Sequence, residues 1–386
     1  VERAVYVDTL RQGNLKIDAS NAGVILDGSD ISNTSGDWIS GLEIHSNGNI
    51  IQGLQIVNFS PAVGIALGGG AQNNTIGGDR SAGSGPLGHG NLVSKVTVGI
   101  SIFDDGTCFN TITGNLIGTG PTGIEAWGND VGIDILKGAS RNIIGPDNII
   151  AYNKEWGVAI RHSNSSGNTI TQNSIHDSDV GVAILKGASR NIIGPDNIIA
   201  YNNDCNINIR DSNSSGNTIT QNSIHDSKER VFEVKEGGIY LWKGGNTELP
   251  APVILDFDLA AGTVTGFACA DCSVEIFSDS SDEGEVYEGQ TTAGRPAFFT
   301  LSKGASLVGP CLTATATDAD GNTSQFSMPT SGTFKSTSLQ GENNLPRIRL
   351  QVKESGELED NRIGIWAHCF WGPGGARSLS RCGLGC

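Results

Sequence analysis

The sequence predicts an all-β protein, a right-handed parallel β-helix followed by a small β-sandwich. Three observations support this fold class: an internal repeat, short strand-like segments, and a composition suited to tight turns. Residues 135–153 and 184–202 both read ILKGASRNIIGPDNIIAYN. Residues 163–178 and 212–227 both read SNSSGNTITQNSIHDS, at the same offset of 49 residues. Such a repeat indicates a solenoid, in which each unit buries its apolar residues only by stacking on its neighbours.

Each 49-residue unit contains two coils of about 25 residues, and each coil has three short strands. In one coil the strand-like segments are residues 157–160, 168–170 and 173–175, each with alternating apolar residues or a lone Ile. The first strands predict one stacked apolar anchor per coil, eight in all: Leu42, Ile65, Ile100, Ile133, Val158, Val182, Ile207 and Ile239. Longer intervals between anchors predict loops inserted between strands.

Asparagine recurs just before the second and third strands of these coils, at Asn142, Asn148, Asn168, Asn173, Asn191, Asn197, Asn217 and Asn222. One interpretation is a row of polar ligands for a bound molecule. The other is an internal ladder, in which stacked amides bond from coil to coil. We favour the ladder, because Asn also tolerates the backbone angles of tight turns.

Composition excludes several other classes of protein. The chain has 386 residues, 54 of them Gly, and its 25 Lys and Arg are outnumbered by 41 Asp and Glu, which gives a net charge of −16. The sequence has no apolar run long enough for a membrane-spanning helix. It has no basic cluster, and its negative charge repels phosphate backbones, so nucleic acid is not an expected partner. Because residue 1 is Val, the chain is interpreted as processed or trimmed.

The pattern predicts three regions: a β-helix over residues 1–245, a sandwich over 246–330, and a tail over 331–386. Residues 263–267, 274–277 and 312–317 read as sandwich strands, and Asp320-Gly321 reads as a hairpin turn. The tail fits neither unit and is interpreted as low-order or non-native sequence.

Several motifs resemble a large family of bacterial secreted or cell-surface proteins with right-handed β-helix repeats. The motifs are NTIGG at residues 74–78, GNLIGT at 114–119, and GN at 128–129 followed by GIDI at 132–135. Residues 274–279, VEIFSD, resemble the immunoglobulin-like sandwich module that follows such repeats. The resemblance covers roughly residues 5–330 and implies a pectate-lyase-like solenoid, an extracellular or cell-surface location, and no assigned activity.

We therefore expect a structural or adhesive role, with polysaccharide or other copies of the chain as partners. The alternative is a carbohydrate-active enzyme, a polysaccharide lyase or glycoside hydrolase acting on an acidic polysaccharide. This alternative rests on fold-level analogy alone.

Asp104, Asp105 and His89 are weak candidates for catalysis, because polygalacturonase-like enzymes use paired Asp residues and a Gly-His-Gly segment. Here Gly88-His89-Gly90 precedes the Asp pair, the reverse of that family. The Asp pair also reads as an ordinary turn. His176-Asp177 and His225-Asp226 are interpreted as solvated turns, because adjacent side chains at a strand end are expected to diverge.

A basic stripe is the stronger binding candidate. Turns after the first strands carry Lys137, Arg141, Arg161, His162, Lys186, Arg190 and Arg210, and register is expected to stack them on one corner of the solenoid. Such a stripe suits uronate or sulfate groups. The alternative is that repeated turns merely repeat their solvating charges. Trp127 and Trp156 are candidates for stacking on sugar rings.

The sandwich contains candidate metal and disulfide positions. Asp279, Asp282, Glu283 and Glu285 are dense enough for calcium, and Asp318, Asp320 and Asn322 alternate like oxygen ligands, but neither group matches a full calcium loop. We favour acidic turns and expect no cofactor. Cys269 and Cys272 form a CxxC, and a disulfide that involves Cys269, Cys272 or Cys311 fits an extracellular setting.

Overall fold

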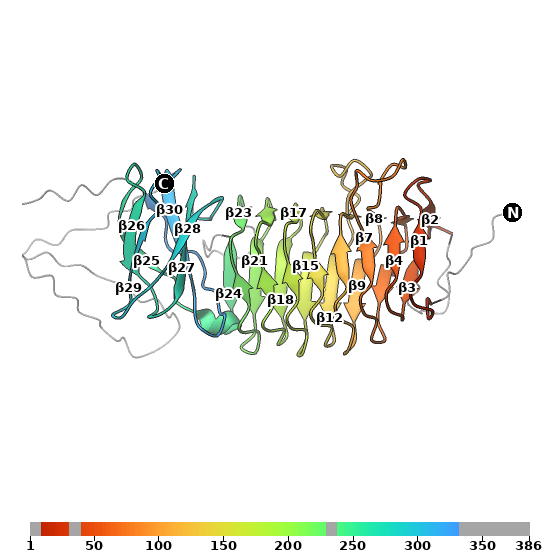
Figure 1. Ribbon diagram of the computed structural model, residues 1–386, viewed down its shortest axis with the longest axis horizontal. Coiled ribbons are helices and arrows are strands. Elements are labelled where there is room, and N and C mark those ends of the chain that lie inside the picture. Colours follow the sequence, from red (N-terminus) through yellow and green to blue (C-terminus); the bar gives the residue numbers. More distant parts are fainter. Residues whose placement is uncertain (1–8, 31–39, 229–237, 332–386) are drawn as a thin grey trace, which may run out of the picture. The chain divides into compact units, whose positions relative to one another are not determined.

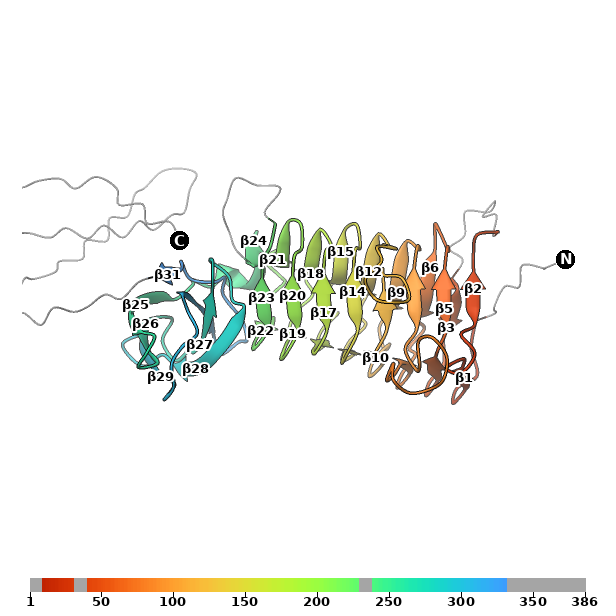
Figure 2. The same ribbon diagram turned by 90° about the horizontal axis from the view of Figure 1, so that it is seen from above.

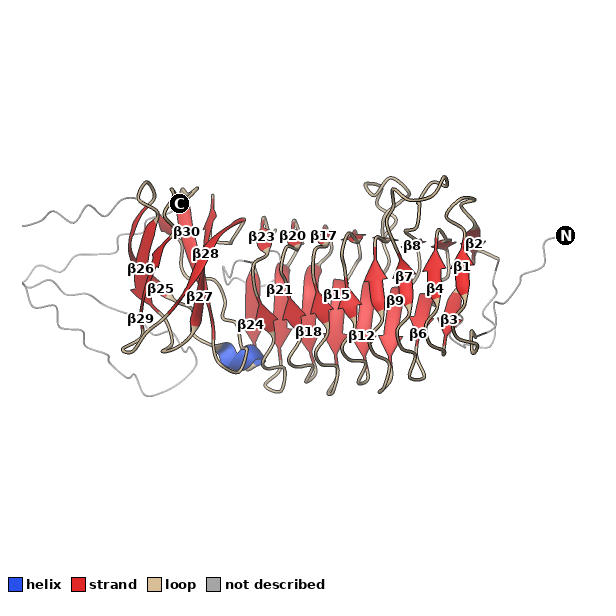
Figure 3. Ribbon diagram, in the orientation of Figure 1, coloured by secondary structure: helices blue, strands red, loops and turns tan. Residues whose placement is uncertain are grey.

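The computed structural model describes residues 9–30, 40–228 and 238–331, and these residues form the predicted β-helix and sandwich (Figure 1). The predicted tail lies outside the described residues, apart from Ser331. Described residues of both parts belong to one compact unit. Strands dominate, and the one helical element described is a short 3-10 turn, η1 (Gly245–Glu248), as Figure 3 shows.

Three parallel sheets run the length of the β-helix, as Figure 2 shows from above. The first sheet contains β1 (Lys16–Asp18), β4 (Ile50–Gln52), β7 (Thr75–Gly77), β10 (Thr111–Thr113), β13 (Ile143–Ile144), β16 (Thr169–Ile170), β19 (Ile192–Ile193) and β22 (Thr218–Ile219). The second contains β2 (Ile25–Asp27), β5 (Gln55–Val57), β8 (Leu92–Ser94), β11 (Leu116–Ile117), β14 (Ile149–Ala151), β17 (Ser174–His176), β20 (Ile198–Ala200) and β23 (Ser223–His225). The third contains β3 (Leu42–Ile44), β6 (Val63–Leu67), β9 (Val98–Phe103), β12 (Val131–Leu136), β15 (Trp156–Arg161), β18 (Val180–Leu185), β21 (Cys205–Arg210) and β24 (Ile239–Trp242).

Each sheet has eight strands, so the eight predicted coils are confirmed. The predicted anchors pair in register: Ile133 of β12 lies between Ile100 of β9 and Val158 of β15, and all three are fully buried. Burying a side chain of this size stabilises the fold by about 1.5–3 kcal/mol. The interior of the β-helix is therefore one continuous apolar core.

Two asparagine ladders flank this core, which confirms the structural interpretation of the recurrent Asn residues. In one ladder the Nδ2 group of Asn168 donates to Oδ1 of Asn191, 3.0 Å away, and the same oxygen accepts the backbone N–H of Asn168 at 3.0 Å. In the other, Asn173 makes the same pair of bonds to Asn197. The ladder residues are at most 3% exposed, so they are not available to bind another molecule.

The second part of the chain forms two antiparallel sheets that share an apolar core, as a sandwich does. One sheet contains β25 (Val253–Asp258), β26 (Thr263–Phe267) and β29 (Phe298–Ser302). The other contains β27 (Ser273–Asp279), β28 (Val286–Thr292), β30 (Cys311–Thr317) and β31 (Thr330–Ser331). Cys269 and Cys272 are joined in a disulfide before β27, and Cys311 is not part of that bond.

The four-stranded sheet also covers the last coil of the β-helix. Val274 and Ile276 of β27 pack into the sandwich core, whereas Phe277 and Phe326 join the core of the β-helix. The last strand of each parallel sheet donates a backbone N–H to an acceptor from this region, each at 2.9 Å: Ile219 of β22 to Oγ1 of Thr323, Ile224 of β23 to the carbonyl of Gly284, and Leu241 of β24 to Oε1 of Gln325. The sandwich therefore caps strand edges that would otherwise be open to pairing.

Candidate functional site

The third sheet has the longest strands of the β-helix. Charged, aromatic and apolar side chains lie where those strands end. Two adjacent rows run from coil to coil there. The strand-end row consists of Phe103, Leu136, Arg161, Leu185, Arg210 and Trp242, the last residues of β9, β12, β15, β18, β21 and β24. The turn row consists of the residues that follow them: Asp104, Lys137, His162, Lys186, Asp211 and Lys243.

All six residues of the turn row have a left-handed backbone, with φ between 51° and 78°. This conformation turns the backbone sharply out of the third sheet after each of these strands. Because it recurs in every coil of the row, the side chains at these positions point in the same direction. Lys137, Lys186 and Lys243 are exposed, whereas the other three residues of the row are half-buried. The turn row is therefore a set of equivalent surface positions with a different occupant in alternate coils.

The predicted single basic stripe is corrected by this register. Arg161 aligns with Leu136 and Leu185, so it belongs to the strand-end row, one residue before the positions of Lys137 and Lys186. Because strand side chains alternate in direction, a shift of one residue changes the surface that each side chain faces. The cations thus lie in two rows of one corner.

Arg161 is held by a carboxylate on the outer face of the third sheet. Its Nε donates to Oδ1 of Asp134 at 2.9 Å, and its Nη2 contacts the other carboxylate oxygen. The Asp134 side chain is 3% exposed and that of Arg161 is 23% exposed. The Arg161 guanidinium also lies over the Trp156 ring, 5.6 Å from its centroid. Arg161 is therefore a neutralised cation, paired with Asp134 of the preceding coil.

Arg210 occupies the same place one repeat later, where the residue equivalent to Asp134 is not acidic. The counterpart of Asp134 in that repeat is Ala183, which pairs with Asn208 of β21. Within residues 9–30, 40–228 and 238–331, Arg210 has no ion pair. The duplicated units therefore differ in charge at this corner.

His162 breaks the series of lysines in the turn row. Burial, reinforced by the nearby charges of Lys186 and Arg161, lowers the pKa of His162 below its usual value. The ring is consequently neutral near pH 7.

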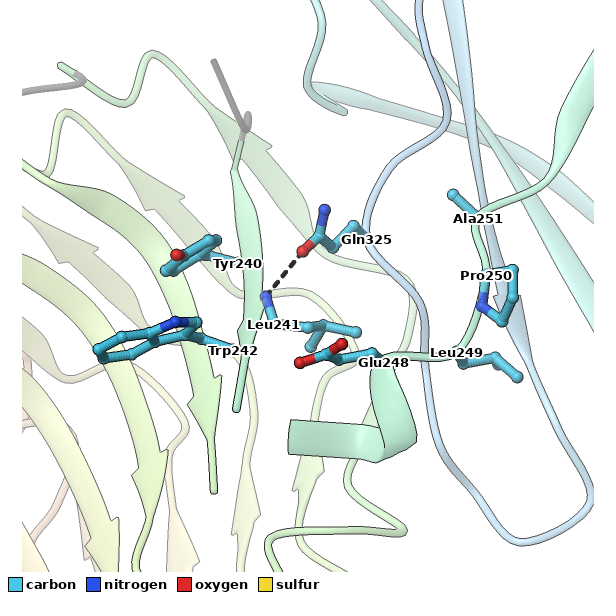
Figure 4. A pocket seen from close by; sticks show the side chains of 8 residues that line it. All are labelled: Tyr240, Leu241, Trp242, Glu248, Leu249, Pro250, Ala251 and Gln325. Carbon is cyan, nitrogen blue, oxygen red and sulfur yellow. Dashed lines mark hydrogen bonds between the residues drawn. The ribbon is translucent and has the colours of Figure 1, made fainter. Parts of the chain in front are cut away.

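Aromatic rings accompany the cations along the same corner. The ammonium of Lys137 lies 5.9 Å from the centroid of the Phe103 ring, and that of Lys243 lies 4.1 Å from that of Trp242. Tyr240 and Trp242 project from the same side of β24, whereas Leu241 points the other way (Figure 4). Beside β24 the chain forms an open pocket of about 340 Å³, lined by these residues and by Glu248, Leu249, Pro250, Ala251 and Gln325.

The remaining binding candidates lie at different places. Arg141 and Arg190 are exposed later in the turns that begin at Lys137 and Lys186. The Arg141 guanidinium lies 5.9 Å from the centroid of the Phe109 ring. Trp127 packs on the outer face of the second sheet, with the Lys95 ammonium 4.2 Å from its ring. Trp127 and Trp156 therefore do not form one platform.

The candidate catalytic residues are not brought together. His89 lies in the loop between β7 of the first sheet and β8 of the second. Asp104 and Asp105 lie in the turn that leaves the third sheet after β9, at another corner of the coil. Asp104 begins a tight turn, in which its carbonyl accepts the N–H of Thr107 at 3.2 Å. This placement agrees with the turn interpretation.

The side chains of the two His-Asp pairs were expected to diverge, but in the structure they contact each other. Nδ1 of His176 lies 2.9 Å from Oδ2 of Asp177, and His225 and Asp226 repeat this distance. Each Asp has a left-handed backbone, which folds its carboxylate back toward the preceding ring. The pairs lie where β17 and β23 of the second sheet end, and their duplication argues against a single catalytic centre.

Two of the acidic candidates for calcium, Glu283 and Asp318, accept hydrogen bonds within the fold. Glu283 accepts the backbone N–H of Gly238 at 2.6 Å and that of Ser227 at 3.1 Å, and its carboxylate also contacts the Ser227 hydroxyl. Asp318 accepts the N–H groups of Asp320 and Asn322 within one turn. Across the part of the chain that the structure describes, no three His, Cys, Asp or Glu residues are grouped to hold a metal ion. No helix within that part is long and apolar enough to cross a membrane.

A comparison with protein families agrees with the β-helix. The family model described as "Right handed beta helix region" matches residues 126–249. Among solved structures, an alginate lyase from Paenibacillus sp. str. FPU-7 is similar, with 18% sequence identity over 57% of this chain and 78% of that chain and a TM-score of 0.35. A similarity this weak carries no information about ligands or activity. No curated protein matches the chain.

Proposed function

We propose that this protein acts outside the cell or at its surface as an adhesive β-helix, and that it binds an acidic polysaccharide along the corner after the third sheet. The observation that carries this proposal is the charge of that corner. Between β12 and β21 it contains six cations, Lys137, Arg141, Arg161, Lys186, Arg190 and Arg210, and two carboxylates, Asp134 and Asp211. This local excess stands on a chain of net charge −16.

The geometry favours binding through many weak contacts. Each exposed cation contributes roughly 0.2–1 kcal/mol to an ion pair, because water screens the charge. Coils stack about 4.8 Å apart, so successive cations meet one extended chain and their contributions act together. A long polymer thus fits this corner better than a small molecule.

The aromatic rings add contacts that suit sugars. Trp242 is 38% exposed, and Tyr240 projects beside it. Ring faces of this kind bury the apolar faces of pyranose sugars, while the neighbouring cations bind their acidic groups.

Binding without cleavage is the simpler proposal. The catalytic candidates lie at separate corners, and the buried carboxylate Asp134 is already paired with Arg161. Adhesion gains from repeated contacts, whereas catalysis needs one organised centre.

The test measures binding of polyuronates and of a neutral glucan at low and high salt. The triple variant Lys137→Gln, Lys186→Gln and Lys243→Gln is expected to bind polyuronate roughly tenfold more weakly, since three exposed contacts are lost. The matched control is Lys154→Gln, because Lys154 is exposed but paired with Asp130 before β15. Equal binding by both variants would contradict the proposal. Appearance of unsaturated products or new reducing ends would favour the enzyme instead.

A further inference from the structure

The turn row alternates in charge from coil to coil. Lysine occupies it in the coils of β12, β18 and β24, at Lys137, Lys186 and Lys243. Aspartate or histidine occupies it in the coils of β9, β15 and β21, at Asp104, His162 and Asp211. No two successive coils carry a lysine there.

In the strand-end and turn rows, the coils between the lysines carry no net positive charge. In the coil of β15, His162 is half-buried and Arg161 is neutralised by Asp134. In the coil of β21, Arg210 has no ion pair among the described residues, but Asp211 follows it directly, so their charges sum to zero. The Asp211 carboxylate accepts the backbone N–H of Lys186 at 2.9 Å. An anion opposite these coils therefore meets charges that cancel, with a half-buried histidine or a carboxylate in the turn row.

Duplication of the sequence does not by itself produce this alternation. Lys137 and Lys186 are copies of each other, because they lie 49 residues apart in the repeated segment. Lys243 lies outside both verbatim copies and still falls two coils beyond Lys186, over the ring of Trp242. The pattern thus continues where the copy ends.

The spacing of the lysines corresponds to two sugars. Coils stack about 4.8 Å apart, so lysines in alternate coils recur at roughly 10 Å. An extended polysaccharide advances by about this length per disaccharide.

We infer that the ligand is an acidic polysaccharide with its charge on every second sugar, such as a uronate alternating with a neutral amino sugar. This inference rests on the proposed function and specifies which class of acidic polysaccharide is bound. A polymer with a charge on every sugar places half of its carboxylates opposite Asp104, His162 or Asp211.

The test compares hyaluronan, which carries one carboxylate per disaccharide, with polygalacturonate, which carries one per sugar. Oligosaccharides of equal length are titrated into the full chain at fixed ionic strength. Hyaluronan is expected to bind up to about fivefold more tightly, because it places no carboxylate opposite Asp104 or Asp211. This factor is the upper end of the effect of one surface charge contact.

The double variant His162→Lys and Asp211→Asn makes the test directional. Lys has the same left-handed backbone at positions 137 and 186, and Asn keeps an acceptor for the Lys186 N–H. The variant is expected to gain affinity for polygalacturonate and to lose the preference for hyaluronan, with an unchanged circular dichroism spectrum. Equal or tighter binding of polygalacturonate by the native chain would overturn the inference and leave the proposed function standing. Failure of both polymers to bind would overturn both.

Discussion

The Glu283 carboxylate is expected to hold the sandwich onto the end of the β-helix, so its removal should be costly. Its oxygens accept the N–H of Gly238, the N–H of Ser227 and the Ser227 hydroxyl. Glu283 is 3% exposed, and Gly238 is buried against Ile224 and Phe326. Glu283→Ala therefore leaves donors without a partner at a site that water reaches poorly.

The magnitude follows from these donors. A buried donor without a partner costs about 1–3 kcal/mol. Most of this cost comes from the buried Gly238 N–H. Half-buried Ser227 can instead form some of its hydrogen bonds with water. The substitution also removes the cost of burying a charge, which offsets part of the loss. The net expected loss in unfolding free energy is about 3 kcal/mol.

Urea unfolding followed by circular dichroism measures this loss, with size-exclusion chromatography to detect association through the uncovered strand edges. The control is Glu285→Ala, because Glu285 is exposed in the same loop. A Glu283→Ala midpoint equal to that of the control would refute the capping argument.

Three further outcomes are expected. Asn191→Ala leaves the Asn168 N–H unpaired inside the ladder and should lower the unfolding free energy by about 3 kcal/mol, measured by urea unfolding. Burial raises the pKa of Glu275 above 4.5, so the folded chain keeps a proton that the unfolded chain has lost. Stability from this group is therefore full below the ordinary pKa and falls as pH rises through the raised pKa. The thermal midpoint should accordingly fall with rising pH above pH 4.5, and Glu275→Gln should reduce this slope. Cys269→Ser with Cys272→Ser opens a very short loop and should cost about 2 kcal/mol in the same assay, whereas no change would mean that the turn alone fixes this segment.

The repeat predicted the β-helix because its periodicity encodes both burial and register. Each anchor, such as Ile133 or Val158, must face the interior, and parallel pairing then places equivalent residues above one another. The same logic predicted the asparagine ladders. Local rules suffice for these features because every coil repeats them.

The basic corner was predicted only in part, because its rows depend on single-residue offsets. Lys137, Lys186 and Lys243 each lie four residues after an anchor, whereas Arg161 lies three residues after Val158. Counting from the anchors would have separated the rows and found Lys243. The pairing of Arg161 with Asp134 carries no such signal, since it joins neighbouring coils and Asp134 is replaced by Ala183 in the next repeat.

The cap could not be read from periodicity at all. Glu283 reaches a β-helix residue 45 positions away, and Thr323 reaches one 104 positions away. Neither contact recurs, so nothing in the repeat indicates it. An acidic run such as residues 279–285 consequently resembled a metal site, although burial and its donors make Glu283 a structural acceptor.

Capping also bears on the hypothesis of self-assembly. A β-helix extends by adding strands to its ends, which requires free N–H groups on the terminal coil. At β22, β23 and β24 the sandwich has taken one such donor in each sheet, so growth from this end would first have to displace it. The sides of the coils carry no such obstruction, and there the exposed lysines of the turn row lie. An adhesive role requires contact with a partner along the side of the coils rather than through this end. End-to-end polymerisation does not explain such a contact.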